Sequence, residues 1–240
     1  MDAKIDELMS GATGEATPPV HPAPREALDR EEQLIRDSVL RMGALVEAAI
    51  REASRALTTH DAELALDVIK GDAIINEAQR GVSRLIAVTI ATQQPVARDL
   101  RYLLTLDHVT YELERIGDHA SSLAKQALKL APEPPLEGYV HLPEMAELGA
   151  QLVHGVLRAL VDADAVQARQ IAVDDDEIDR LYHATFDEVL ELMRRDPTNV
   201  ERGTRIIIAS HYLERIGDRA TNIAEDVVYL VTGDVEDLNP

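Results

Sequence analysis

The chain contains no cysteine, which excludes a disulfide scaffold, a thiolate zinc site and a cysteine nucleophile. Any metal ion must therefore be held by oxygen atoms or by imidazole. Tryptophan is also absent, and aromatic residues make up only 3% of the 240 residues. Because Ala, Leu, Val, Ile, Glu, Asp and Arg dominate instead, the composition favours aliphatic packing between helices over a β-sandwich core.

Positive charge is scarce, with 24 Lys and Arg residues against 44 Asp and Glu residues and a formal net charge of −20. This balance disfavours nucleic acids and anionic membrane surfaces as ligands, and it favours cations or basic protein patches. No apolar run approaches the roughly twenty residues that cross a bilayer. Residues 1–10 are acidic and amphipathic, unlike a signal peptide. We therefore expect a cytoplasmic protein with no direct membrane insertion.

Proline and glycine divide the chain into segments. The stretch GATGEATPPVHPAP at 11–24 lacks apolar periodicity, and APEPPLEGYVHLP interrupts the middle of the sequence. The sequence thus predicts a flexible N-terminal lead over 1–24, a first three-helix bundle over 25–131, a proline-rich connector over 132–141, a second three-helix bundle over 142–233 and a tail over 234–240.

Apolar residues at helical spacing predict six long helices. The first runs from about residue 25 to Thr59, and Asp61 is expected to cap the second. The second should end before Gln93, and Pro95 suits the first turn of the third. The remaining helices are expected at about 142–161, 163–195 and 198–232, with Gly233 as the last C-cap. The predicted fold class is all-α.

An internal repeat indicates that the fold is a duplication. LERIGDHA at 113–120 recurs as LERIGDRA at 213–220, and DAIIN at 72–76 matches DDEID at 175–179 in pattern. Each octapeptide belongs to the third helix of its set. The prediction is a duplicated three-helix bundle with two pseudo-symmetric halves, in which short connections make successive helices antiparallel.

The repeated octapeptide places paired carboxylates on one helix face. Residues four apart lie one turn apart, so Glu114 projects beside Asp118 and Glu214 beside Asp218. Like charges at this spacing repel, so a cation is expected to compensate them. The arginine after each glutamate is about 100° further around the helix, and we expect it to face elsewhere.

Each carboxylate pair marks a stripe along one face of its helix, Glu114 and Asp118 in the first half and Glu214 and Asp218 in the second. Further acidic or imidazole side chains extend these stripes. Asp107 precedes Glu114 by two turns, His211 precedes Glu214, and the preceding helix of each half can supply facing carboxylates. Oxygen-rich sets of this kind suit iron, zinc, magnesium or manganese, and carboxylates can bridge several ions. The candidate metal ligands are Glu114, Asp118, Glu214, Asp218, Asp72, Asp175, Asp179, Asp107, His211 and Glu225.

The two predicted sites differ in quality. Asn76 occupies the place of Asp179, and Lys125 stands where Glu225 would be, so the second half is expected to hold metal better. Gly117 and Gly217 lie in mid-helix, where glycine costs about 1 kcal/mol relative to alanine. Their repetition predicts close helix crossing or access to the carboxylates.

Several segments in order resemble the PhoU family. They are ARDLRYLL at 97–104, LERIGDHA at 113–120 and HYLERIGDRATNIAEDVVYLVTG at 211–233, and the match spans about 28–233. The resemblance implies paired three-helix bundles, metal ions at the two E-x-x-x-D motifs, and negative regulation of phosphate acquisition. It also implies two partners, the cytoplasmic ATPase of a Pst-type phosphate transporter and a PhoR-like histidine kinase, which would bring the chain to the inner membrane face. A homodimer or higher oligomer stays open.

Two other functions remain as alternatives. A carboxylate-bridged metal enzyme is one, because helical bundles host di-metal chemistry. The sequence lacks the Glu-x-x-His pairs of ferritin-like sites and shows no nucleophile beside a base, so no enzyme is expected. The other is a metal-free interaction module whose acids pair with a basic patch on a partner.

Overall fold

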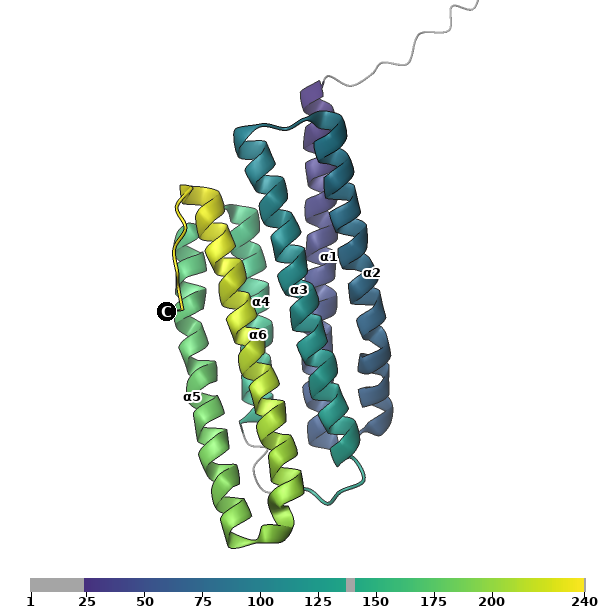
Figure 1. Ribbon diagram of the computed structural model, residues 1–240, viewed down its shortest axis with the longest axis vertical. Coiled ribbons are helices and arrows are strands. Elements are labelled where there is room, and N and C mark those ends of the chain that lie inside the picture. The colour runs from purple at the N-terminus through teal and green to yellow at the C-terminus, as the bar shows by residue number, and fades with distance from the viewer. Residues whose placement is uncertain (1–23, 137–140, 240) are drawn as a thin grey trace, which may run out of the picture.

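The computed structural model describes residues 24–136 and 141–239, which form six α-helices and one 3-10 turn (Figure 1). This part of the chain contains no strand, so the predicted all-α class is confirmed. The predicted lead, apart from Pro24, and residues 137–140 of the predicted connector lie outside the described residues. The helices are α1 (Pro24–Thr59), α2 (Ala62–Gln93), α3 (Ala97–Leu130), α4 (Leu142–Asp162), α5 (Ala165–Arg195) and α6 (Val200–Thr232), and the 3-10 turn is η1 (Pro197–Asn199).

Local side-chain chemistry explains most of the helix ends. Asp61 caps α2 as predicted, because its Oδ1 accepts a hydrogen bond from the Leu64 amide at 3.0 Å. Gly233 ends α6 in the left-handed region at φ 83°. Pro95 was expected inside a helix, and that prediction is wrong. Gln94 takes a left-handed conformation that ends α2, Val96 is extended, and Pro95 lies in the bend between them.

The six helices form two halves that pack side by side (Figure 1). Helices α1, α3, α4 and α6 form the inner part, where α1 contacts α4 and α3 contacts α6. Helix α2 packs outside against α1 and α3, and α5 packs equivalently against α4 and α6. Because α1 and α3 run opposite to α4 and α6, the halves are related by a pseudo-twofold axis, as the duplication predicts.

One continuous apolar core runs through both halves. Apolar residues at helical spacing along α3 belong to this core, since Leu106, Val109, Leu113, Ile116 and Leu123 are fully buried. A shared core ties the two halves into one packed unit. Within the described ranges, none of the helices has the length and apolar character required to cross a membrane.

A polar group at the α3–α6 contact joins the two halves asymmetrically. Glu112 of α3 is 3% exposed, and its Oε2 accepts hydrogen bonds from Arg219 Nη1 at 3.3 Å and Asn222 Nδ2 at 3.2 Å. The pseudo-symmetric contact is different, because there the His119 ring stacks on Tyr212 with centroids 6.1 Å apart. The two contacts that the pseudo-twofold axis relates therefore differ in their side chains and in their chemistry.

The segment after Gly233 turns back along α5 (Figure 1). Arg169 of α5 binds Glu236 through two hydrogen bonds, at 2.6 and 2.8 Å. The Leu238 amide donates to Glu225 Oε1 at 2.9 Å, and the Leu238 side chain packs on the core. These contacts fasten the C-terminal segment to the second half.

Candidate functional site

Asp175 on α5 is the most buried of the candidate ligands. It is 4% exposed and lies against Gly217 of α6, where any side chain would overlap its Oδ1. Its Oδ2 accepts a hydrogen bond from Thr221 Oγ1 at 3.2 Å, whereas Oδ1 has no hydrogen-bond partner among the described residues. A buried carboxylate oxygen without a partner is costly, so this atom has coordination capacity that the described residues leave unused.

Four carboxylates influence one another across the α5–α6 contact. Burial raises the pKa of Asp175 to about 7, and the charges of Asp179, Asp218 and Glu214 add to that shift. Burial also raises the pKa of Glu214 to about 7, with further contributions from Asp218 and Asp179. The pKa of Asp179 is raised by burial and by Asp218. The structure thus places the Asp175, Asp179, Glu214 and Asp218 carboxylates near enough for their charges to influence one another.

The neighbouring arginines do reach the stripes, so the prediction that they face elsewhere is wrong. Arg215 Nη1 lies 3.3 Å from Asp218 Oδ2, and Arg115 Nη1 lies 3.8 Å from Asp118 Oδ2. The reason is that each arginine precedes the aspartate by three residues, a spacing that makes helix neighbours. His211 also contacts the second stripe, since its Nδ1 lies 3.2 Å from Glu214 Oε2.

The first-half stripe has an amide and a lysine, Asn76 and Lys125, where the second half has two acids, although Asp72 Oδ1 is also buried without a hydrogen-bond partner among the described residues. Asp72 on α2 accepts a hydrogen bond from Asn76 Nδ2 at 3.1 Å. Its pKa is raised by burial and by Asp118, but the charge of Lys125 opposes the shift. Burial and Asp118 likewise raise the pKa of Glu114. The Asn76 amide and the Lys125 charge therefore stabilise the Asp72 carboxylate, as a bound cation would.

Two candidate ligands are engaged elsewhere. Asp107 Oδ1 accepts a hydrogen bond from Ser83 Oγ at 2.5 Å, between α2 and α3. Glu225 accepts the Leu238 amide, so its carboxylate faces the C-terminal segment. Helical periodicity groups both residues with the paired carboxylates, but residues outside the stripes bind them.

The second-half residues have the donor atoms that a cation prefers, but their side chains do not close around a single position. As the side chains lie, no three His, Asp or Glu residues of the described chain converge closely enough to hold a metal ion. The donors nevertheless have the character that a cation needs, because Asp175 Oδ1 is buried without a partner and burial together with neighbouring carboxylates raises the pKa of Glu214. Oxygen donors with one imidazole suit hard or borderline cations.

The surroundings of the two mid-helix glycines predict that alanine at position 217 lowers the stability of the protein more than alanine at position 117 does. A Cβ at position 217 would overlap Asp175 Oδ1, whereas one at 117 would meet Ile75 side-chain atoms at 3.1 Å. We expect Gly217→Ala to destabilise the metal-free protein by about 1–2 kcal/mol despite better helix propensity. Gly117→Ala, the matched control, should stay within about 0.5 kcal/mol, because the helix gain offsets a small shift of Ile75. Urea unfolding with chelator present measures both, and equal effects would contradict the assigned role of Gly217.

The raised pKa of Asp175 predicts a pH-dependent stability of the metal-free protein. The folded state holds this proton up to about pH 7, whereas the unfolded chain releases it near the ordinary value of 3.8. The contribution of Asp175 to stability is therefore greatest at low pH and is lost as pH rises through this window. Asp175→Asn should stabilise the protein by about 1–2 kcal/mol at about pH 8, with little gain at about pH 5. Denaturant unfolding with chelator tests this, with the exposed Asp174→Asn as control; equal gains at both pH values would refute it.

Sequence reasoning missed two polar residues at the helix contacts, Thr221 and Glu112. Thr221 holds Asp175 from one turn beyond Gly217. Glu112, at the α3–α6 contact, belongs to neither stripe. A signal for that contact was present, because the two octapeptides differ only at His119 and Arg219, and both residues lie at the α3–α6 contact.

Comparison with known proteins places this arrangement in a family. The PhoU domain model matches the chain twice, at residues 39–127 and 142–227, once in each half. The chain belongs to the PhoU family. The PhoU homologue of Clostridium acetobutylicum, described as a phosphate-specific transport system accessory protein, is 34% identical over 216 residues, which cover 90% of this chain and 99% of the relative.

Two crystal structures of PhoU proteins share the fold. The Pseudomonas aeruginosa protein aligns with a TM-score of 0.82 at 37% identity, covering 86% of this chain and 99% of that chain. The Streptococcus pneumoniae protein, described as a phosphate transport system regulatory protein, aligns with a TM-score of 0.81 at 32% identity, covering 88% and 99%. The PhoU family is one of regulatory and accessory proteins and not of enzymes.

Proposed function

We propose that the protein is a cytoplasmic negative regulator of phosphate uptake and of phosphate-starvation signalling. It would act through two partners, the ATPase of a Pst-type phosphate transporter and a PhoR-like histidine kinase. The observation that carries this proposal is the double PhoU match, with relatives described as phosphate transport accessory proteins that align over nearly their whole length. The net charge of −20 suits basic patches on such partners.

The proposal includes a metal ion bound by the second half. Asp175 and Asp179 of α5 with Glu214 and Asp218 of α6 would hold it, and His211 could add an imidazole. When bound, iron, zinc, magnesium or manganese supplies positive charge between helices whose carboxylates repel. The support is the buried unpartnered oxygen of Asp175 and the raised pKa values around it. The first half is the weaker candidate because Asn76 and Lys125 serve its Asp72.

Gene deletion tests the regulatory role. Cells without the protein, grown with abundant phosphate, should express their phosphate-starvation genes at high level. The wild-type gene should restore repression, and Glu214→Gln with Asp218→Asn shows whether the stripe takes part. Unchanged transcript levels in the deletion strain would refute the regulatory proposal.

Metal analysis separates this proposal from a metal-free interaction module, which the open side-chain geometry favours. Protein purified without a metal-affinity tag should contain iron, zinc, magnesium or manganese. Metal-free protein that still binds the ATPase subunit and the kinase with unchanged affinity would favour the interaction module. In that case weaker binding at high salt would point to charge pairing with the partner.

A further inference from the structure

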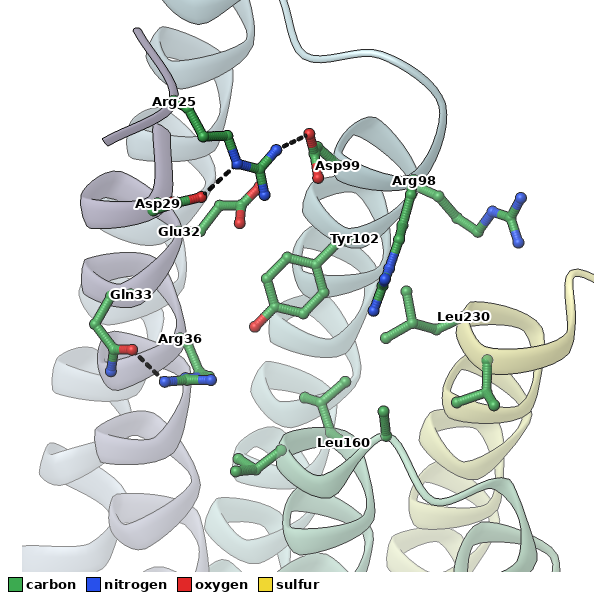
Figure 2. A pocket seen from close by; sticks show the side chains of 14 residues that line it. Arg25, Asp29, Glu32, Gln33, Arg36, Arg98, Asp99, Tyr102, Leu160 and Leu230 are labelled. Atoms are coloured by element: carbon green, nitrogen blue, oxygen red, sulfur yellow. Dashed lines mark hydrogen bonds and ion pairs between the residues drawn. The ribbon is translucent and has the colours of Figure 1, made fainter. Parts of the chain in front are cut away.

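A cavity of about 1020 Å³ opens at the end of the molecule where α1 and α3 begin and where α4 and α6 end (Figure 2). None of the candidate metal ligands lines it. Both halves contribute to it, because Arg98 and Tyr102 come from α3 whereas Leu230 comes from α6. Its volume is in the range of small-molecule sites in proteins.

The cavity gathers positive charge in a strongly acidic protein. Arg25, Arg36, Arg98 and Arg101 line it together with three acids, so its lining carries a net charge of +1 whereas the chain carries −20. Arg25 holds two of those acids, Asp29 at 2.8 Å and Asp99 at 2.6 Å, as Figure 2 shows. Among the acids of the lining, only the Glu32 carboxylate is then left without an ion pair to a described residue.

The three arginines other than Arg25 have hydrogen-bonding capacity to spare. Arg98 forms neither a hydrogen bond nor an ion pair with the described residues. Arg36 donates to the amide oxygen of Gln33, and the Arg101 guanidinium lies over the Tyr229 ring, 5.5 Å from its centroid. A guanidinium has five N–H donors in a planar fork that matches phosphate oxygens, so unused donors from three arginines suit an oxyanion.

Glu32 is compatible with such an anion. Its Oε1 is buried without a hydrogen-bond partner, and burial together with the charge of Asp99 raises its pKa. A carboxyl group in this setting takes up a proton more readily, and a protonated carboxyl can donate a hydrogen bond to an anion oxygen. Glu32 therefore need not oppose the arginines.

Apart from Gln33, the rest of the lining is apolar or aromatic. Leu160, Val161, Leu230 and Val231 come from the ends of α4 and α6, and the Tyr102 ring points toward α1 (Figure 2). An inorganic anion alone would leave this surface and most of the volume unused. An apolar or planar body attached to the anion would cover it.

We propose that this cavity binds a small molecule that carries a phosphoryl group and an apolar or planar body, the chemical class of the nucleotides. The phosphoryl oxygens accept hydrogen bonds from Arg36, Arg98 and Arg101. The body of the ligand lies against Tyr102 and the aliphatic ends of α4 and α6. The site is independent of the carboxylate stripes and of any metal there.

Isothermal titration calorimetry of the full chain, treated with chelator, tests this with adenosine triphosphate, inorganic phosphate and adenosine as probes. Adenosine triphosphate should bind saturably to one site, and inorganic phosphate should compete more weakly. Arg36→Gln with Arg98→Gln should weaken binding about 10-fold to 100-fold, because each charge-assisted hydrogen bond contributes substantially. If inorganic phosphate instead binds as tightly as the nucleotide, free phosphate is the source and the apolar body is refuted.

Three variants make the test specific. Arg194→Gln with Arg195→Gln removes the same two charges at the far end of α5 and should leave binding unchanged. Glu32→Gln should retain or tighten binding, since it replaces a carboxylate by a neutral donor. Glu214→Gln with Asp218→Asn should have no effect, which separates this site from the metal proposal. No saturable binding at about 10 mM, equal binding by adenosine, or normal binding by the double arginine variant of intact fold would overturn the proposal.

Discussion

Replacing Glu214 by Gln and Asp218 by Asn together is expected to weaken metal binding about 100-fold or more. Each amide keeps the size of the carboxylate but removes the charge that a hard cation requires. The effect should be largest here because Asp175 and Asp179 face these two residues across the α5–α6 contact. Titration of chelator-treated protein with zinc, manganese or ferrous ions, followed by elemental analysis, measures the loss.

The matched control is Glu114→Gln with Asp118→Asn in the first half, where the same change should have a smaller effect. Lys125 and Asn76 already serve Asp72 there, so less affinity can be lost. In the metal-free state the second-half variant should be at least as stable as the wild type, because burial and Asp218 raise the pKa of Glu214. Equal losses in the two halves, or unchanged metal content in both variants, would contradict the unequal sites.

Glu112→Leu is expected to destabilise the protein by about 3 kcal/mol, or roughly 6–12 °C in Tm. Glu112 is nearly fully buried and accepts from both Arg219 and Asn222. Without it the Arg219 guanidinium stays between the halves with no carboxylate, and removal of one partner from a buried ion pair is more costly than loss of the pair. Thermal and urea unfolding measure the effect.

A second substitution distinguishes the cost of leaving the Arg219 charge without a carboxylate partner from the cost of poor packing at position 112. Arg219→Met in the Glu112→Leu background should recover much of the lost stability, because an apolar pair can replace a buried ion pair. Glu133→Leu, at an exposed position just after α3, is the control and should change little. If Glu112→Leu costs no more than Glu133→Leu, the proposed importance of the α3–α6 ion pair is wrong.

The fold was largely predictable from local sequence. Apolar spacing along the third helix marked residues that are fully buried in the structure, and Asp61 and Gly233 were recognised as caps because capping depends on near neighbours. The error at Pro95 arose because proline also suits a bend before a helix, and the sequence did not show the left-handed Gln94.

The candidate site was predictable only in part. Spacing and duplication indicated Asp175, Asp179, Glu214 and Asp218, whose mutual influence the pKa values show. Periodicity assigns a residue to a face but does not identify its neighbour on another helix. For that reason Asp107 and Glu225 were placed in the stripes although Ser83 and Leu238 bind them, and the Glu112–Arg219 contact was missed.

The asymmetric contact between α3 and α6 has a consequence for how the two halves recognise each other. Two identical chains related by a twofold axis would repeat each contact. In a pair of second halves, Arg219 of each copy would therefore lie opposite Tyr212 of the other copy, and its guanidinium would have no carboxylate partner. Only the first half supplies Glu112. If the chain were divided in the 131–141 connection and the halves produced separately, they would assemble as a heterodimer, and the second half would be a poor partner for itself.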